Sequence, residues 1–230
     1  MSFRTRTVLT ITAIAIATSF CSPAHADITT SDGNFTNWSF GSYVLAGSTA
    51  SVTLESSGGN PGARLNITTN TGAGAFGYGI KTDFSTSQSI VGAPYTLTLD
   101  ILSGPGAFGE GQGILLVVEQ NGSVYGSNVS PLYTGTATAW SPETFTGTLD
   151  ASLFTNLSGG GSANPDFTSG VPTEFGFAGG NDRSGTLTMY YDNFSLDISG
   201  NFTPTPEPSS LVLLGSAVFG VLGTARRLRR

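Results

Sequence analysis

The sequence has a single cysteine, Cys21, and a single histidine, His25, among its 230 residues. Both lie near the N-terminus, in a segment that the pattern of residues below predicts to be removed. A chain without thiols or imidazoles forms no disulfide, offers zinc neither of its preferred soft ligands and has no imidazole base. The rest of the chain must therefore be stabilised by packing, and its chemistry is restricted to carboxylates, hydroxyls and very few amines.

Positive charge is also scarce. Lys and Arg together number 9 against 15 Asp and Glu, which gives a formal net charge of −6. Six of the nine lie near the two ends, so the middle of the chain keeps only Arg64, Lys81 and Arg183. Nucleic-acid binding depends on Lys and Arg that neutralise phosphates, so the composition excludes a nucleic-acid partner. Lys81 stands alone among Thr and Asp and is expected to be an exposed charge at a strand end.

The N-terminal segment has the three parts of a secretory signal peptide: two basic residues, an apolar run and small residues at a cleavage site, namely Arg4, Arg6, 8–20, Ala24 and Ala26. A transmembrane anchor is the alternative, but the apolar run is shorter than the roughly 20 residues that a span needs. We expect export through the Sec translocon and cleavage by signal peptidase after Ala26. This cleavage removes Cys21 and His25.

Residues 27–202 carry the patterns of an all-β domain. Apolar and polar residues alternate at 95–101, 50–54, 65–67 and 145–149, which is typical of strands with one buried face. The run 114–118 is apolar throughout and predicts a central strand covered on both faces, or a buried helical segment as the alternative. Gly-rich stretches predict loops at 56–62, 103–113 and 158–170. The predicted fold is a jelly-roll type β-sandwich.

The last predicted strand contains a slip in its alternation. Apolar residues occupy odd positions up to Tyr191 and even positions from Phe194 onwards. Such a slip turns one half of a strand inside out unless an extra residue is accommodated, so we predict a β-bulge at Asp192 and Asn193. In the alternative, Tyr190 and Asp192 face inward, and the buried carboxylate then needs a partner.

The stretches "DGNFTNWSFGS" at 32–42 and "YYDNFSLDI" at 190–198 resemble the paired ends of jelly rolls of the carbohydrate-binding-module type. In that family an acidic residue after the first Phe and an Asp of the last strand commonly help to hold a structural calcium. The resemblance implies Asp32, Asn34 and Asp192 as candidate calcium ligands, although Thr36 stands where the first carboxylate is expected. The alternative is that Asp32 and Asn34 only form a turn.

Sugar binding requires exposed aromatic rings beside groups that bond hydroxyls. The stretch "VVEQNGSVYG" at 117–126 brings such groups together, and the candidate ligand-binding residues are Glu119, Gln120, Asn121, Tyr125 and Trp140. A Trp in a small sandwich also serves as a core or rim residue, so a structural protein without a ligand is the alternative. A glycosidase needs two carboxyls roughly 5–9.5 Å apart, and the available acids, Glu110, Glu119, Glu143 and Glu174, form no recognisable motif. We therefore predict no enzyme activity and keep a glycan-active enzyme only as a second alternative.

The C-terminal segment has the pattern of a sorting signal. A Pro-punctuated linker at 203–210 precedes fifteen mostly apolar residues at 211–225. As a helix they extend about 22 Å, somewhat less than the roughly 30 Å hydrocarbon core of a bilayer. We expect one short transmembrane helix, and the positive-inside rule keeps the four arginines that follow in the cytoplasm, namely Arg226, Arg227, Arg229 and Arg230.

The order of these parts, with Pro206, Glu207 and Pro208 ahead of a short span and an Arg-rich end, closely resembles the PEP-CTERM sorting signal. The resemblance implies a Gram-negative-type bacterium, recognition and cleavage of the tail by the membrane transpeptidase exosortase, and release or transfer to the cell surface. It also implies association with exopolysaccharide or biofilm matrix. The expected function is that of an exported, surface-sorted, non-catalytic protein of the envelope or matrix that interacts with carbohydrate.

Overall fold

The computed structural model of the protein describes residues 26–107, 112–128, 132–133, 137–168 and 170–202. The predicted signal peptide up to residue 25 and the predicted sorting segment from residue 203 lie outside the described residues. Residues Asp27–Gly200 form one compact unit. In the part of the chain that is described, no helix is both long and apolar enough to cross a membrane.

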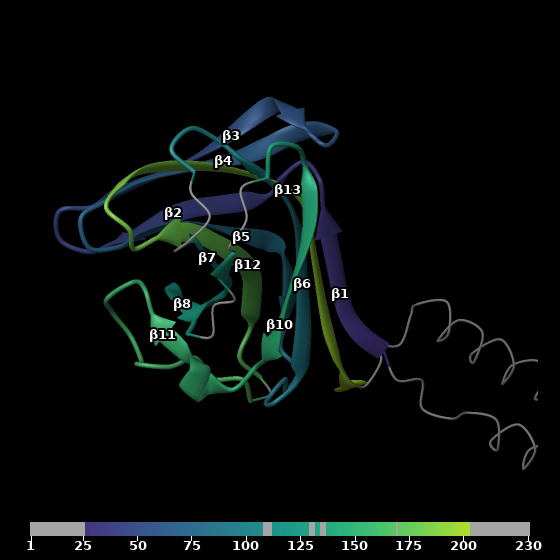
Figure 1. The fold of residues 1–230 in the computed structure, drawn as a ribbon. Helices are drawn as coiled ribbons and strands as arrows, with labels where there is room; N and C mark the ends of the chain where they lie inside the picture. The colour runs from purple at the N-terminus through teal and green to yellow at the C-terminus, as the bar shows by residue number, and fades with distance from the viewer. Residues whose placement is uncertain (1–25, 108–111, 129–131, 134–136, 169, 203–230) are drawn as a thin grey trace, which may run out of the picture. The chain divides into compact units, whose positions relative to one another are not determined.

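The described strands form two antiparallel sheets (Figure 1). The six-stranded sheet has the order β10-β6-β13-β4-β3, with β1 paired to β13. Its strands are β1 (Ala26–Asp32), β3 (Thr49–Gly59), β4 (Gly62–Thr71), β6 (Pro94–Ser103), β10 (Ser141–Thr148) and β13 (Gly185–Phe202). The all-β sandwich predicted from the sequence is confirmed, while its jelly-roll type stays a prediction.

The seven-stranded sheet has the order β11-β8-β7-β12-β5-β2, with β9 paired to β7. Its strands are β2 (Trp38–Val44), β5 (Ala75–Thr86), β7 (Gln112–Gln120), β8 (Ser123–Ser127), β9 (Leu132–Tyr133), β11 (Phe154–Asn156) and β12 (Thr173–Asn181). A short 3-10 helix, η1 (Ala151–Leu153), precedes β11.

Burial follows the alternation that the sequence shows. In β6 the residues Tyr95, Leu97, Leu99 and Ile101 are buried, whereas the intervening Thr96 and Thr98 are half-buried. Strand β7 contains the apolar run 114–118, is buried at nearly every position and lies between β8 and β12. The central strand predicted for this run is confirmed, and the helical alternative is wrong.

The core joins the two sheets through aromatic rings around Phe177 of β12. The Phe177 ring centroid lies 5.2 Å from that of Tyr191 and 6.1 Å from that of Phe194, both in β13 of the opposite sheet. It also lies 6.0 Å from Trp38 and 6.3 Å from Phe35. Offset and edge-on ring pairs at these distances contribute packing beyond the area that they bury. We call these five residues the aromatic core.

The predicted bulge is confirmed. The register of β13 against β6 shifts between Asp192 and Ser195, and Asn193 has φ 49°, a left-handed conformation. The bulge lets Tyr191 and Phe194 both face the core despite the slip in their spacing. The alternative is right for Asp192 alone, whose side chain is fully buried as well.

Two expectations are wrong. Residues 56–62 do not form a loop, because β3 continues to Gly59 and β4 begins at Gly62, with only Asn60 and Pro61 between the paired residues. This tight hairpin requires glycine at position 59. A Cβ there would lie 1.9 Å from the carbonyl oxygen of Ala63, and glycine has none. Lys81 is not an exposed charge either. It is 8% exposed and is paired with Asp32 and Asp83.

The aromatic core predicts a large loss of stability on truncation. Phe177→Ala removes the central ring from a site where the residue has no exposed surface, and the free energy of unfolding should fall by about 3–5 kcal/mol. Phe40→Ala makes the same chemical change at a residue that is 37% exposed and should cost clearly less. Denaturant unfolding of both variants checks this, and equal losses would contradict the packing described.

Candidate functional site

The hairpin of β7 and β8 carries four of the five predicted ligand-binding residues, and it divides them between two faces. Phe175 and Phe177 of the neighbouring β12 point into the core. Their partners in β7, Val118 and Leu116, therefore face the core as well. Gln120 follows Val118 by two residues and so lies on the same inner side. Glu119 is one residue out of phase and lies on the outer face of the seven-stranded sheet. Asn121 has φ 51° in the two-residue turn of the hairpin, where Asn is favoured for its conformation.

The inner side of this hairpin forms one wall of a pocket of about 320 Å³. Its lining residues are Gln120, Asn121, Ser123, Tyr125, Gly161, Ser162, Asp166 and Val171. The polar groups of this wall are already used by the protein. The Gln120 side chain donates to the carbonyl of Asp166 and to the hydroxyl of Thr173, each at 2.7 Å, and accepts from the Asp166 N–H at 2.8 Å.

The Tyr125 side chain also has a structural role in this pocket. Its hydroxyl lies 2.9 Å from the Ser162 hydroxyl, and the residue is 2% exposed. A ring this buried cannot cover the face of a sugar in this arrangement. The residues Gln120 and Tyr125 therefore hold the loop after β11 against the hairpin.

The outer face of the seven-stranded sheet places two carboxylates side by side. Glu119 of β7 lies directly opposite Glu174 of β12, and both are half-buried. Side chains of such a cross-strand pair lie about 4.5–5.5 Å apart at Cβ, and like charges at this spacing are destabilising. Neither carboxylate has a hydrogen bond or an ion pair with any described residue.

This juxtaposition changes the acid–base behaviour of Glu174 and of a tyrosine on the neighbouring β5. Burial raises the pKa of Glu174, and the charge of Glu119 raises it further. Burial also raises the pKa of Tyr78 in β5, again with a contribution from Glu119. Perturbed ionisable groups that lack a structural partner are typical of functional sites.

An apolar floor lies beside these groups on the same face. It is formed by Ile80, Leu115, Val117, Val124 and Ala178, with Phe76, Tyr78 and Leu157 partly buried against it. The ring of Tyr78 leans over the neighbouring β2, because a Cβ at Gly41 would lie 2.4 Å from its hydroxyl oxygen. Glycine at position 41 thus leaves room for the ring. We call Glu119, Glu174, Tyr78 and this floor the outer-face site.

Two of the three polar members of this site were not predicted as ligand-binding residues. Glu174 was named only among the available acids, and no motif in the sequence links it or Tyr78 to Glu119. The only local signal is the alternation in β12, where Glu174, Gly176, Ala178 and Gly180 share one face opposite to the two phenylalanines. Small residues on a strand's outer face leave room for the side chains of its neighbours.

Trp140 does not join either group. It is half-buried and directly precedes β10, whose first residue Ser141 pairs with Ile101 in the six-stranded sheet. Its place is therefore at the edge strand of the sheet that does not carry the outer-face site.

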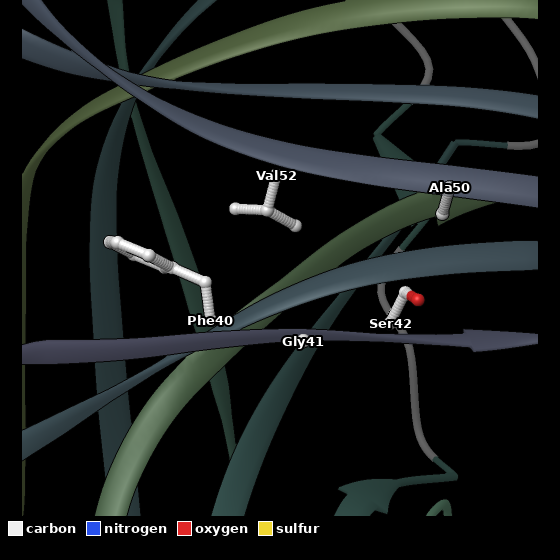
Figure 2. A pocket seen from close by; sticks show the side chains of 5 residues that line it. All are labelled: Phe40, Gly41, Ser42, Ala50 and Val52. Carbon is white, nitrogen blue, oxygen red and sulfur yellow. The ribbon is translucent and has the colours of Figure 1, made fainter.

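A second, smaller pocket of about 140 Å³ lies between the edge strands β2 and β3 (Figure 2). Its lining side chains are those of Phe40, Ser42, Ala50 and Val52, of which only Ser42 carries a hydroxyl, and Gly41 completes the wall. Figure 2 shows the side chains of Phe40 and Val52 in the space between the two strands.

The predicted calcium residues lie at the end of β1 and in β13. Asp32 accepts hydrogen bonds from the backbone N–H groups of Asn34 and Phe35, which form a turn. Asp192 accepts from the backbone N–H groups of Asn60 and Asn193. Within the described ranges, no group of three or more His, Cys, Asp or Glu side chains is placed to hold a metal ion.

Comparison with known families identifies the C-terminal segment. Residues 204–230 match the family model described as the PEP-CTERM protein-sorting motif. The motif predicted from Pro206, Glu207 and Pro208 is thereby confirmed. It implies export, sorting to the cell surface and processing by exosortase. The sequence matches no curated protein.

The sandwich is similar to solved carbohydrate-binding modules. It is 17% identical to the family 11 module of the cellulosomal cellulase Lic26A-Cel5E of Clostridium thermocellum, over 77% of this chain and 96% of that one, with a TM-score of 0.43. The xylan-binding module CBM15 is 7% identical over 77% of this chain and 100% of its own, with a TM-score of 0.46. The CBM22-1 xylan-binding domain of Paenibacillus barcinonensis Xyn10C is 12% identical over 78% and 98%, with a TM-score of 0.42.

We predict that repulsion between Glu119 and Glu174 destabilises the fold. In Glu119→Gln the pKa of Glu174 should fall towards its usual value of 4.5, and the free energy of unfolding at neutral pH should rise by about 0.2–1 kcal/mol. A raised folded-state pKa means that stability is lost as the pH rises from 4.5 through that pKa, so the gain should vanish below this window.

Denaturant unfolding at pH values on both sides of the window measures this effect. Glu143→Gln in β10 is the matched control, because Glu143 lies in the other sheet and accepts a hydrogen bond from Ser141. A loss of stability in Glu119→Gln at neutral pH would contradict the repulsion.

Proposed function

We propose that this chain is an exported, non-catalytic matrix or envelope protein whose sandwich binds an uncharged glycan at the outer-face site. The observation that carries the proposal is the opposed pair of Glu119 and Glu174, which has no cationic partner among the described residues and lies beside Tyr78 and an apolar floor. A destabilising arrangement of this kind persists where function uses it.

The chemistry of a sugar matches these groups. Each carboxylate oxygen is a strong acceptor for the hydroxyl donors that surround a pyranose ring, and hydrogen bonds to charged acceptors are stronger than neutral ones. The half-buried ring of Tyr78 suits the CH face of the same sugar, and the buried residues of the apolar floor support that ring from below. One face thus supplies both kinds of contact that a carbohydrate needs.

The charge of the protein favours a neutral glycan over an acidic one. The chain has a net charge of −6, and the two glutamates add local negative charge where the ligand binds. Uronic or sulfated polysaccharides would be repelled by this field. Glycan hydrolysis is the alternative that the binding experiment must separate from this proposal, because the spacing of a cross-strand pair is close to that between the two carboxyls of a retaining glycosidase.

The predicted processing puts the sandwich outside the cell. The signal peptide is removed after Ala26, the helix at 211–225 spans the membrane until exosortase acts at 206–208, and the sandwich then associates with the surface matrix. Retention of neutral exopolysaccharide in that matrix is the role that follows from the outer-face site.

Affinity electrophoresis against a panel of neutral and acidic polysaccharides tests the binding. Wild-type protein should be retarded by at least one neutral polysaccharide and by no acidic one. Glu174→Gln and Tyr78→Ala should each weaken this binding roughly tenfold, the loss of one charge-assisted hydrogen bond or one ring contact. Glu143→Gln should bind as the wild type does. Retardation by no neutral polysaccharide would refute the proposal, and release of reducing ends would favour the enzyme alternative.

Mass spectrometry of the surface form tests the processing. The mature chain should begin at Asp27 and lack the residues beyond the Pro-Glu-Pro motif. Replacement of Pro206, Glu207 and Pro208 by alanine should leave the tail in place and the protein in the membrane fraction. Arg230 still attached to the wild-type surface form would contradict exosortase cleavage.

A further inference from the structure

A buried lysine lies at the corner where β1 ends and β2 begins. Lys81 of β5 is directly opposite Trp38 of β2, and its side chain is 10% exposed. Its ammonium lies 3.0 Å from Oδ2 of Asp32, whose side chain is 11% exposed. A charge of this burial is stable only when it is paired and hydrogen-bonded.

The carboxylate of Asp32 has no acceptor position left. Its Oδ1 accepts the N–H groups of Asn34 at 2.8 Å and Phe35 at 2.7 Å. Its Oδ2 accepts the indole N–H of Trp38 at 3.1 Å and the ammonium of Lys81 at 3.0 Å. A carboxylate offers about four lone-pair positions, and all four are filled by N–H donors.

The same ammonium also holds a second carboxylate. Asp83 lies 2.7 Å from Lys81 through Oδ1, and its Oδ2 accepts the side-chain amide of Asn37 at 3.0 Å. Lys81 thus joins β5 to the end of β1, and Asp83 connects this pair to the turn before β2 through Asn37. Bridging of oxygens from separate segments is the structural role that a bound calcium performs in other proteins.

The other predicted calcium ligand, Asp192, also accepts N–H donors, but it has no cation beside it among the described residues. Its two oxygens accept the backbone N–H groups of Asn60 and Asn193. Asp100, opposite Asp192 in the neighbouring β6, accepts the side-chain amides of the same two asparagines at 2.9 and 2.8 Å. Calcium prefers six to eight oxygen ligands, whereas these carboxylates are met by N–H donors.

We propose that the ammonium of Lys81 takes the place of a structural calcium in this sandwich, so that Asp32 is the partner of a lysine and the fold is independent of calcium.

Thermal unfolding of the purified full-length chain in mild detergent tests the first part. The melting temperature should be the same in excess calcium and in excess EDTA. A rise in calcium that exceeds the measurement error would overturn the proposal, whichever carboxylate is responsible.

A double-mutant cycle tests the role of the lysine. Lys81→Met leaves two carboxylates without their cation and should lower the melting temperature by on the order of 10 °C. Arg64→Met is the matched control, because Arg64 pairs with Glu55 where the side chains are 21% and 30% exposed, and its loss should be several-fold smaller.

In the Lys81→Met background, Asp32→Asn should cost much less than it does in the wild type, because the carboxylate is then already unpaired. Additive losses from the two substitutions would overturn the pairing. Should Lys81→Met fail to fold, Lys81→Arg with the same cycle partner keeps the test open: a melting temperature close to that of the wild type and still insensitive to calcium supports the proposal, and a calcium-dependent one overturns it.

Discussion

Packing of Phe177 between the two sheets is the contact on which the rest of the structure depends. The sequence has a single cysteine, so no disulfide within the chain can link the sheets, and rings from β12, β13 and the β1–β2 segment hold them together. The same strand also builds the outer-face site. Because successive residues of a strand point to opposite faces, turning Phe175 and Phe177 inward places Glu174, Gly176 and Ala178 outward.

The link between the core and the register of β12 explains why two like charges lie opposite each other on the outer face. The core fixes the register of β12 against β7, and this register sets Glu174 opposite Glu119. The backbones of the two glutamates cannot move apart without a shift of register that would turn the phenylalanines out of the core. The fold therefore holds a repulsive pair in place, and a hydroxyl-rich ligand would relieve it by donating hydrogen bonds to both carboxylates.

The features that could be predicted from the sequence depend on residues that are close together in the chain. Alternation identifies the buried face of β6 because burial repeats every second residue, and the slip between Tyr191 and Phe194 is enough to predict a bulge at Asn193. The sorting motif is equally local, since its parts are consecutive in the chain.

The failures involve partners that lie far apart in sequence. Lys81 looked like a surface charge because its partner Asp32 is 49 residues away. The opposition of Glu119 and Glu174 depends on the pairing of two strands that are not consecutive, which no alternation pattern specifies. Tyr125 belongs to a strand whose inner and outer faces cannot be distinguished until the neighbouring strand is known, and it proved to be buried. The direction of a side chain relative to the core was thus harder to predict than the strand itself.

The central claim is that a neutral glycan binds where Glu119 and Glu174 meet. Carbon-13 NMR of the side-chain carboxylates reports this contact directly while a neutral oligosaccharide is added. The account predicts that the Glu119 and Glu174 resonances shift together and saturably, and that those of Glu143 and Asp192 stay where they are. Saturable binding that moves neither glutamate, or that moves only carboxylates of the six-stranded sheet, would contradict it.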